Sequence, residues 1–182
     1  MRIIMNRLAI ATLAALPLLA AAQISHAANY DCVEVELFQP GDSSQAESRE
    51  DKRAAAIPPE VLATLQQGIV QELPNTLKGM TAVKAGDAGC PDAATAISFG
   101  GTVTDYKKGN KAARYFIGLG AGKQKFAVNA WIKAKASGAV LGEDEVVDRK
   151  VGGIFGGSAD KGVRDFAEKV GGFIKKTLKS KS

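Results

Sequence analysis

The sequence predicts an α+β domain in which a mostly antiparallel sheet carries an N-terminal and a C-terminal helix on one face. Two segments, beginning near Pro58 and near Asp160, place apolar residues at helical spacing. Between them, residues 126–134 put Phe, Val, Ala, Ile and Ala at alternate positions, which is typical of a strand with one buried face. No internal repeat is present, so we expect one domain over residues 29–182.

The first 28 residues have the layout of a secretory signal peptide. A short basic start precedes an apolar run over residues 8–22, and Ser25-His26-Ala27 with Ala28 offers a small-x-small cleavage site. The apolar run is too short to span a bilayer stably, although an uncleaved anchor is the alternative. We expect cleavage near Ala27/Ala28 and a soluble, periplasmic or secreted protein. Cys32 lacks the context of a lipoprotein cysteine.

The composition narrows the possible chemistry. The 182 residues are 46% apolar and 24% charged, which is too apolar for a disordered chain. Without the first 28 residues, 22 basic residues face 19 acidic ones and no histidine remains. This excludes histidine-based catalytic triads, histidine-ligated metals and histidine pH switches from the mature chain. We expect no metal and no cofactor.

Two cysteines, Cys32 and Cys90, remain in a chain expected to fold in an oxidising compartment. An even pair in that setting indicates a structural disulfide. A metal site or a redox pair is the competing interpretation, but two cysteines 58 positions apart and without histidine fit neither.

The elements are expected in the following order. Residues 33–37 alternate apolar and charged side chains and predict a half-buried strand, and the polar residues 39–53 predict an exposed loop. A helix opens at Pro58-Pro59, is disturbed by Pro74 and ends at Gly79. A short strand follows over residues 80–84.

The second half of the chain predicts a meander and a helix. Residues 93–107 are rich in strand-forming side chains, with a bulge expected at Gly100-Gly101. The strand over 126–134 leads into a two-residue turn at Ser137-Gly138 and a returning strand over 140–151. The closing helix begins near Asp160 and carries lysines in its last turns, where cations interact favourably with the helix dipole.

One segment stands out by its charge. Residues 106–142 contain eight basic residues and no Asp or Glu, whereas the rest of the mature chain is net acidic. Such an asymmetry should attract anions, which in the envelope are phospholipid headgroups, lipopolysaccharide and cell-wall polymers rather than nucleic acid. The alternative is an ordinary solvated lysine face.

Two glycine clusters, residues 118–122 and 152–157, accompany the basic residues. The first has neither the spacing of a phosphate-binding loop nor that of a dinucleotide fingerprint. Glycine can serve only turns and bulges, or it can allow close packing against a partner, lipid or another copy. The candidate interaction surface comprises Lys107, Lys108, Lys111, Arg114, Tyr115, Phe116, Gly118, Gly120, Gly122 and Lys123.

Catalytic motifs are weak. Ser158-Ala159-Asp160-Lys161 matches the serine–lysine spacing of penicillin-recognising enzymes, but the accompanying motifs are absent and Ser158 also suits a helix N-cap. The acids Glu143-Asp144-Glu145 and Asp148 are interpreted as a solvated strand edge that discourages pairing, rather than a calcium or glycosidase site.

The central block resembles a known family. Residues 101–106, 109–115 and 118–123, followed by Ser137-Gly138-Ala139-Val140-Leu141 and the second glycine cluster, are similar to the domain of unknown function 4410. The resemblance implies a secreted envelope protein, and many members are lipoproteins, but it implies no activity. The absence of a lipoprotein cysteine here departs from those members.

These observations predict a non-enzymatic periplasmic accessory protein that binds an envelope partner or an anionic surface through residues 106–125. Two alternatives stay open: a serine–lysine hydrolase using Ser158 and Lys161, and a self-assembling structural subunit.

Overall fold

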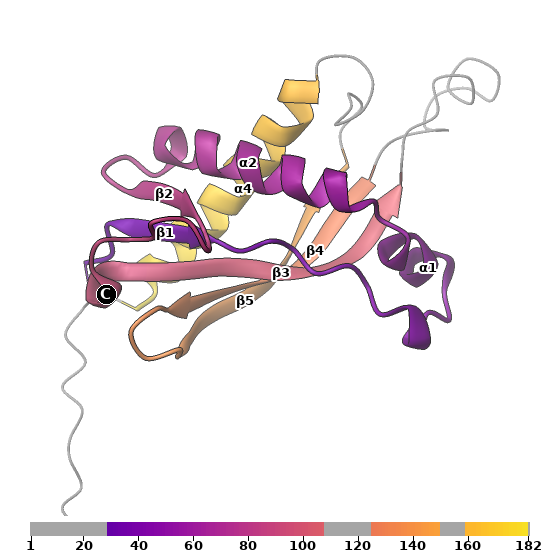
Figure 1. The fold of residues 1–182 in the computed structure, drawn as a ribbon, viewed down its shortest axis with the longest axis horizontal. Coiled ribbons are helices and arrows are strands. Elements are labelled where there is room, and N and C mark those ends of the chain that lie inside the picture. Colours follow the sequence, from indigo (N-terminus) through magenta and orange to yellow (C-terminus); the bar gives the residue numbers. More distant parts are fainter. Residues whose placement is uncertain (1–28, 108–124, 150–158, 182) are drawn as a thin grey trace, which may run out of the picture.

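The computed structural model describes residues 29–107, 125–149 and 159–181 (Figure 1). The predicted signal peptide and most of the basic, glycine-rich segment lie outside these ranges. The described elements, in chain order, are β1 (Cys32–Val35), α1 (Arg49–Ala55), α2 (Pro59–Thr76), β2 (Thr81–Lys84), β3 (Ala96–Lys107), β4 (Lys125–Ala134), β5 (Val140–Asp148) and α4 (Ala159–Lys179). Two single 3-10 turns, Ser43–Gln45 and Ala93–Thr95, precede α1 and β3.

The five strands form one mixed sheet in the order β2-β1-β3-β4-β5. β1 pairs in parallel with both β2 and β3, so Cys32 lies beside Thr81 on one side and Ala96 on the other. The longer strands β3, β4 and β5 pair antiparallel, which makes most of the sheet antiparallel. The α+β class is therefore confirmed, and the parallel pairings of β1 are the feature that local patterns did not reveal.

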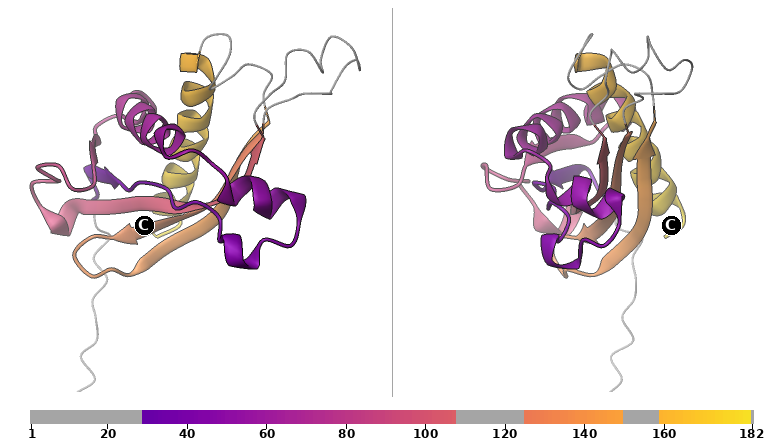
Figure 2. Two further views of the ribbon diagram at one scale, coloured as in Figure 1. Left: turned by 45° about the vertical axis from the view of Figure 1, so that its right-hand side comes forward. Right: turned by 90° about the vertical axis from the view of Figure 1, so that its right-hand side faces the viewer.

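The core is formed by side chains of the sheet and of the two long helices. Val33, Ile97, Phe99 and Ile132 contribute from the strands, while Leu65 and Ile69 contribute from α2 and Phe166 and Ile174 from α4. Figure 2 shows these two helices beside each other and next to the strands. Four aromatic rings meet edge-to-face within it: Phe38 contacts Phe99, Phe126 and Phe166 at centroid distances of 5.8, 6.3 and 6.2 Å. The helical stripes expected from the sequence are the buried faces of α2 and α4.

The segment expected as an exposed loop contains a helix, so that prediction was wrong over Arg49–Ala55. Ser48 caps α1 reciprocally: its hydroxyl accepts from the Asp51 amide at 3.0 Å, and the Asp51 carboxylate accepts from the Ser48 amide at 3.0 Å. Only Ala54 of this helix is buried, which is why hydrophobic periodicity did not indicate it. Figure 1 shows α1 at the end of the sheet where β3 finishes.

Three details of the strands also differ from the predictions. β1 is buried at all four positions because it is a central strand. The β3 bulge lies between Val103 and Asp105 rather than at Gly100-Gly101. The β4–β5 hairpin falls where expected, but its loop is longer than two residues: Ala134 donates its amide to the Ala139 carbonyl, and Gly138 has a φ of 69°.

The predicted disulfide between Cys32 and Cys90 is present, with a Cα–Cα distance of 5.9 Å. It ties the chain before β3 to the central strand β1. Beside it, buried Glu34 accepts a hydrogen bond from the Cys90 amide at 3.0 Å and another from the Lys135 ammonium. One covalent bond and two hydrogen bonds thus hold β1 at Cys32 and Glu34.

Candidate interaction surface

The structure describes only the edge of the predicted surface. Lys107 is exposed and ends β3. The remaining predicted residues lie outside the described ranges: Lys108, Lys111, Arg114, Tyr115, Phe116, Gly118, Gly120, Gly122 and Lys123. What the structure does show is how the two strands that carry this segment are held.

β3 and β4 bring two like charges together where the segment leaves the sheet. Lys107 and Lys125 are direct cross-strand partners, an arrangement that destabilises a sheet when it is not compensated. Lys125 is compensated by Asp105, since its Nζ lies 3.0 Å from Asp105 Oδ2. Lys107 has no such ion pair among the described residues, so the exposed positive charge at this end of the sheet is carried by Lys107.

Asp105 is a buried carboxylate held by cations from two elements. Its side chain is 3% exposed, and Oδ1 accepts a hydrogen bond from Arg53 Nε of α1 at 2.8 Å. Burial of a carboxylate is unfavourable unless charge partners replace its water, and Arg53 and Lys125 together supply that replacement. The β3 bulge places Asp105 opposite Ala127, where Arg53 reaches it.

Arg53 extends the network to a second carboxylate. Its guanidinium donates to Glu50 Oε1 at 2.9 Å, one helical turn earlier. This hydrogen bond lowers the pKa of Glu50, and the bonds to Glu50 and Asp105 raise the pKa of Arg53 despite its partial burial. The anchor network Glu50–Arg53–Asp105–Lys125 therefore fixes α1 against the base of the basic segment.

Several of the described lysines in residues 106–142 already make contacts within the protein. Lys125 and Lys135 are neutralised by Asp105 and Glu34, two acids from outside the segment. Lys133 lies with its Nζ 4.1 Å from the Trp131 ring centroid, a cation–π contact. Lys107 is exposed, and the other basic residues of the segment, Lys108, Lys111, Arg114 and Lys123, lie outside the described residues.

Sequence reasoning missed the anchor network because charge counting ignores pairing across the fold. One signal was present in the sequence: Asp105 is the last acid before the acid-free segment and stands in an otherwise strand-like run. An isolated carboxylate at such a position requires a cation when it is buried. The partner, Arg53, is 52 residues away and could not be identified from spacing.

The acids of β5 divide into two groups. Glu143, Asp144 and Glu145 are exposed on this edge strand, as expected. Asp148 is buried instead, and the prediction of a solvated edge was wrong there: Lys169 of α4 donates to its carboxylate at 2.8 Å. In the described ranges no cluster of three His, Cys, Asp or Glu side chains could hold a metal ion.

The serine–lysine pair stays untested by the structure. Ser158 lies outside the described residues, and the side chain of Lys161 is not described. Among the helices that the structure does describe, none is both long enough and apolar enough to cross a bilayer.

The fold and site define an α+β domain with one disulfide, in which a buried carboxylate, Asp105, links β3 to α1 and β4. The chain belongs to the domain of unknown function family DUF4410, whose family model matches residues 24–154. This agrees with the resemblance noted in the sequence.

Solved structures share the arrangement only distantly. PelC dodecamers from Paraburkholderia phytofirmans are 12% and 11% identical with a TM-score of 0.46, over 79% and 78% of this chain and 87% and 88% of theirs. A putative neuraminyllactose-binding hemagglutinin homolog from Helicobacter pylori is 12% identical with a TM-score of 0.37, over 82% of this chain and 83% of its own. No curated protein sequence matches the chain.

Proposed function

We propose that the protein is a non-enzymatic accessory protein of the bacterial periplasm or cell envelope that binds an anionic surface or an envelope partner through residues 106–125. The observation that carries this proposal is the pairing of Lys125 with Asp105 beside exposed Lys107. The anchor network neutralises the base of the segment and leaves its remaining cations without an acid in the segment to pair with. Such an arrangement favours an external anion.

The compartment supports the same proposal. The chain begins with a signal-peptide-like segment, and its two cysteines form a disulfide, which persists in oxidising compartments.

We infer that α2 and α4 cover one face of the sheet. In support of this, Gly142 of β5 lies against Thr177 of α4, and Gln66 of α2 donates to the Val35 carbonyl of β1.

The test is co-sedimentation with phosphatidylglycerol-containing vesicles and with lipopolysaccharide at low and high salt. Screening shortens from about 10 Å at 0.1 M to about 3 Å at 1 M salt, so binding should fade. Changing Lys107, Lys108, Lys111 and Arg114 together to Gln should weaken binding. Arg49, Lys52, Arg164 and Lys181 changed to Gln provide the charge-matched control. Binding that ignores both salt and the first variant would contradict the proposal.

Two further measurements address the alternatives. Gly120→Leu should leave the melting temperature nearly unchanged and abolish crosslinking to a partner or another copy if the glycine run is an interaction surface. Labelling by a fluorescent penicillin, lost in Ser158→Ala, would instead identify a serine–lysine hydrolase.

A further inference from the structure

A second basic region lies at the other end of the fold, at the C-terminal ends of α2 and α4. There, a cleft of about 590 Å³ opens between the two helix ends, the residues just before β2 and the first described residues of the chain. Its volume is in the range of small-molecule sites. The lining residues used below are Tyr30, Leu77, Met80, Lys78, Lys175 and Lys179.

The floor of the cleft is apolar and belongs to the edge of the core. Leu77 is 6% exposed, and Tyr30 and Met80 are partly buried side chains that pack against the core cluster. An alkyl group placed on this floor would remove apolar surface from water on both partners.

The rim of the cleft is cationic. Lys78, Lys175 and Lys179 are all exposed, and no acidic side chain is among the described residues that line the cleft. Lys175 and Lys179 are one turn apart on α4, a spacing at which like charges repel and destabilise a helix. Their neighbour Lys176 faces elsewhere, with its Nζ 3.9 Å from Asp144 of β5. The α4 lysines are therefore divided between a strand acid and the cleft.

Lysines near a helix C-terminus also interact favourably with its carbonyl groups. That effect accounts for basic residues at the ends of both helices, Lys78 after α2 included, but it does not explain why three lysines from two helix ends surround one apolar floor. A ligand with both a negative group and an alkyl chain satisfies both parts of the cleft.

We propose that this cleft binds a single-chain anionic lipid, with the headgroup at Lys78, Lys175 and Lys179 and the alkyl chain against Leu77, Met80 and Tyr30. The shared chemistry is a carboxylate or phosphate on one acyl chain, so a fatty acid and a lysophospholipid are the two sources. The proposal concerns a site separate from residues 106–125 and does not depend on the function proposed for them.

Isothermal titration calorimetry of the full mature chain tests the proposal with four probes below their micelle concentrations. Laurate and lauroyl-lysophosphatidylglycerol are the anionic probes, monolaurin is neutral with the same chain, and acetate is a headgroup alone. We expect an anionic lipid to bind, monolaurin to bind about tenfold more weakly, and acetate not to bind. Binding of only one anionic probe identifies the source. Equal binding of laurate and monolaurin, or no binding of either anionic probe, would overturn the proposal.

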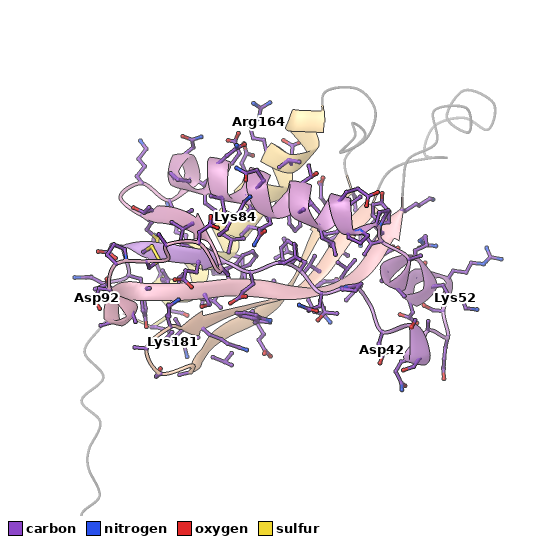
Figure 3. All side chains as sticks on the ribbon, in the orientation of Figure 1. Asp42, Lys52, Lys84, Asp92, Arg164 and Lys181 are labelled. Carbon is purple, nitrogen blue, oxygen red and sulfur yellow. A yellow bond between two sulfur atoms is a disulfide. The ribbon has the colours of Figure 1, made fainter. Side chains whose placement is uncertain are left out.

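Variants separate recognition from stability. Lys175→Glu creates an attractive pair with Lys179 one turn along α4, so the helix should be at least as stable while anionic-lipid binding is lost. Lys78, Lys175 and Lys179 changed together to Gln should weaken binding about tenfold or more. Arg49→Gln, Lys52→Gln and Arg164→Gln remove the same charge elsewhere; Figure 3 shows Lys52 on α1 and Arg164 near the start of α4. If this control weakened lipid binding equally, binding would depend only on the net charge of the protein, which would contradict the proposed site.

Discussion

Gly68 of α2 lies directly against Val163 of α4, so closely that a Cβ at position 68 would sit 1.9 Å from Val163 Cγ1. The same relation occurs further along the helix pair, where a Cβ at Gly171 would sit 2.4 Å from Thr76 Cγ2. Each helix therefore places a glycine against a side chain of the other helix, and this lets the two helices pack closely. This contact holds together the two elements that close the core.

Gly68→Ala should destabilise the protein by roughly 1–3 kcal/mol, because the added methyl group must displace Val163 or push the helices apart. The matched control is Gly172→Ala, where a Cβ meets nothing within 4 Å and alanine favours the helix by up to about 1 kcal/mol. Urea denaturation measures both. A Gly68→Ala variant as stable as Gly172→Ala would show that the helices do not pack this closely.

Asp105→Asn should destabilise the fold by roughly 1–3 kcal/mol, because it leaves Arg53 and Lys125 facing each other without their carboxylate. Both cations are about one third exposed, which moderates the loss. In a double-mutant cycle with Arg53→Met, the two effects should fall short of additivity. Glu50→Gln, on the exposed end of the network, should change the denaturation midpoint little; additive effects at Arg53 and Asp105 would refute the network.

The contribution of Glu34 to stability should depend on pH. Burial alone raises the pKa of this carboxyl. The hydrogen bonds from Lys135 and the Cys90 amide, together with the charge of Lys135, lower the pKa by more than burial raises it, so the pKa lies below 4.5. A lowered pKa in the folded state stabilises the protein above about pH 4.5 and loses that stabilisation as pH falls through the folded value.

The unfolding free energies of the wild type and Glu34→Gln should therefore differ at pH 7 and approach each other as the pH is lowered below 4.5. Glu143→Gln, on the exposed face of β5, is the charge-matched control and should change stability less. A difference that grows as the pH is lowered would contradict the sign of this linkage.

The disulfide makes a prediction that is independent of the helices. Protein recovered from an oxidising compartment should contain no titratable thiol after denaturation, because Cys32 and Cys90 are paired. Replacing both by Ser should lower the unfolding free energy by up to about 4 kcal/mol in the chain-entropy estimate for a separation of 58 residues. Two free thiols in such material would show that the bond does not form in the cell.

Local patterns predicted the long elements well. The apolar stripe of Leu65 and Ile69 lies on α2, and the stripe around Phe166 lies on α4. The alternating residues from Phe126 to Ala134 lie on β4. α1 escaped because its sequence is nearly all charged and its helix rests on a capping box and one buried alanine. The bulge in β3 was misplaced because glycine was taken as its sign, whereas Gly100 lies under the Trp131 ring.

The positive charge of the candidate segment could be predicted from the sequence but its pairing could not, since charge is a property of the chain and charge pairing is a property of the fold. The acid-free run from 106 to 142 is visible in the sequence, yet Lys125 and Lys135 are taken out of it by Asp105 and Glu34. The cleft at the ends of α2 and α4 joins residues 30, 77–80 and 175–179, which no local window contains.

The sequence by itself determined where the long helices and strands form, that the two cysteines pair and where positive charge accumulates, because each depends on near neighbours or on composition. Only the tertiary structure decided that β1 runs parallel between β2 and β3, that Arg53 meets Asp105, and that Gly68 lies against Val163. These arrangements depend on burying several apolar faces at the same time. A buried charge needs its distant ionic partner beside it, and a glycine needs a distant side chain to fill the space above it.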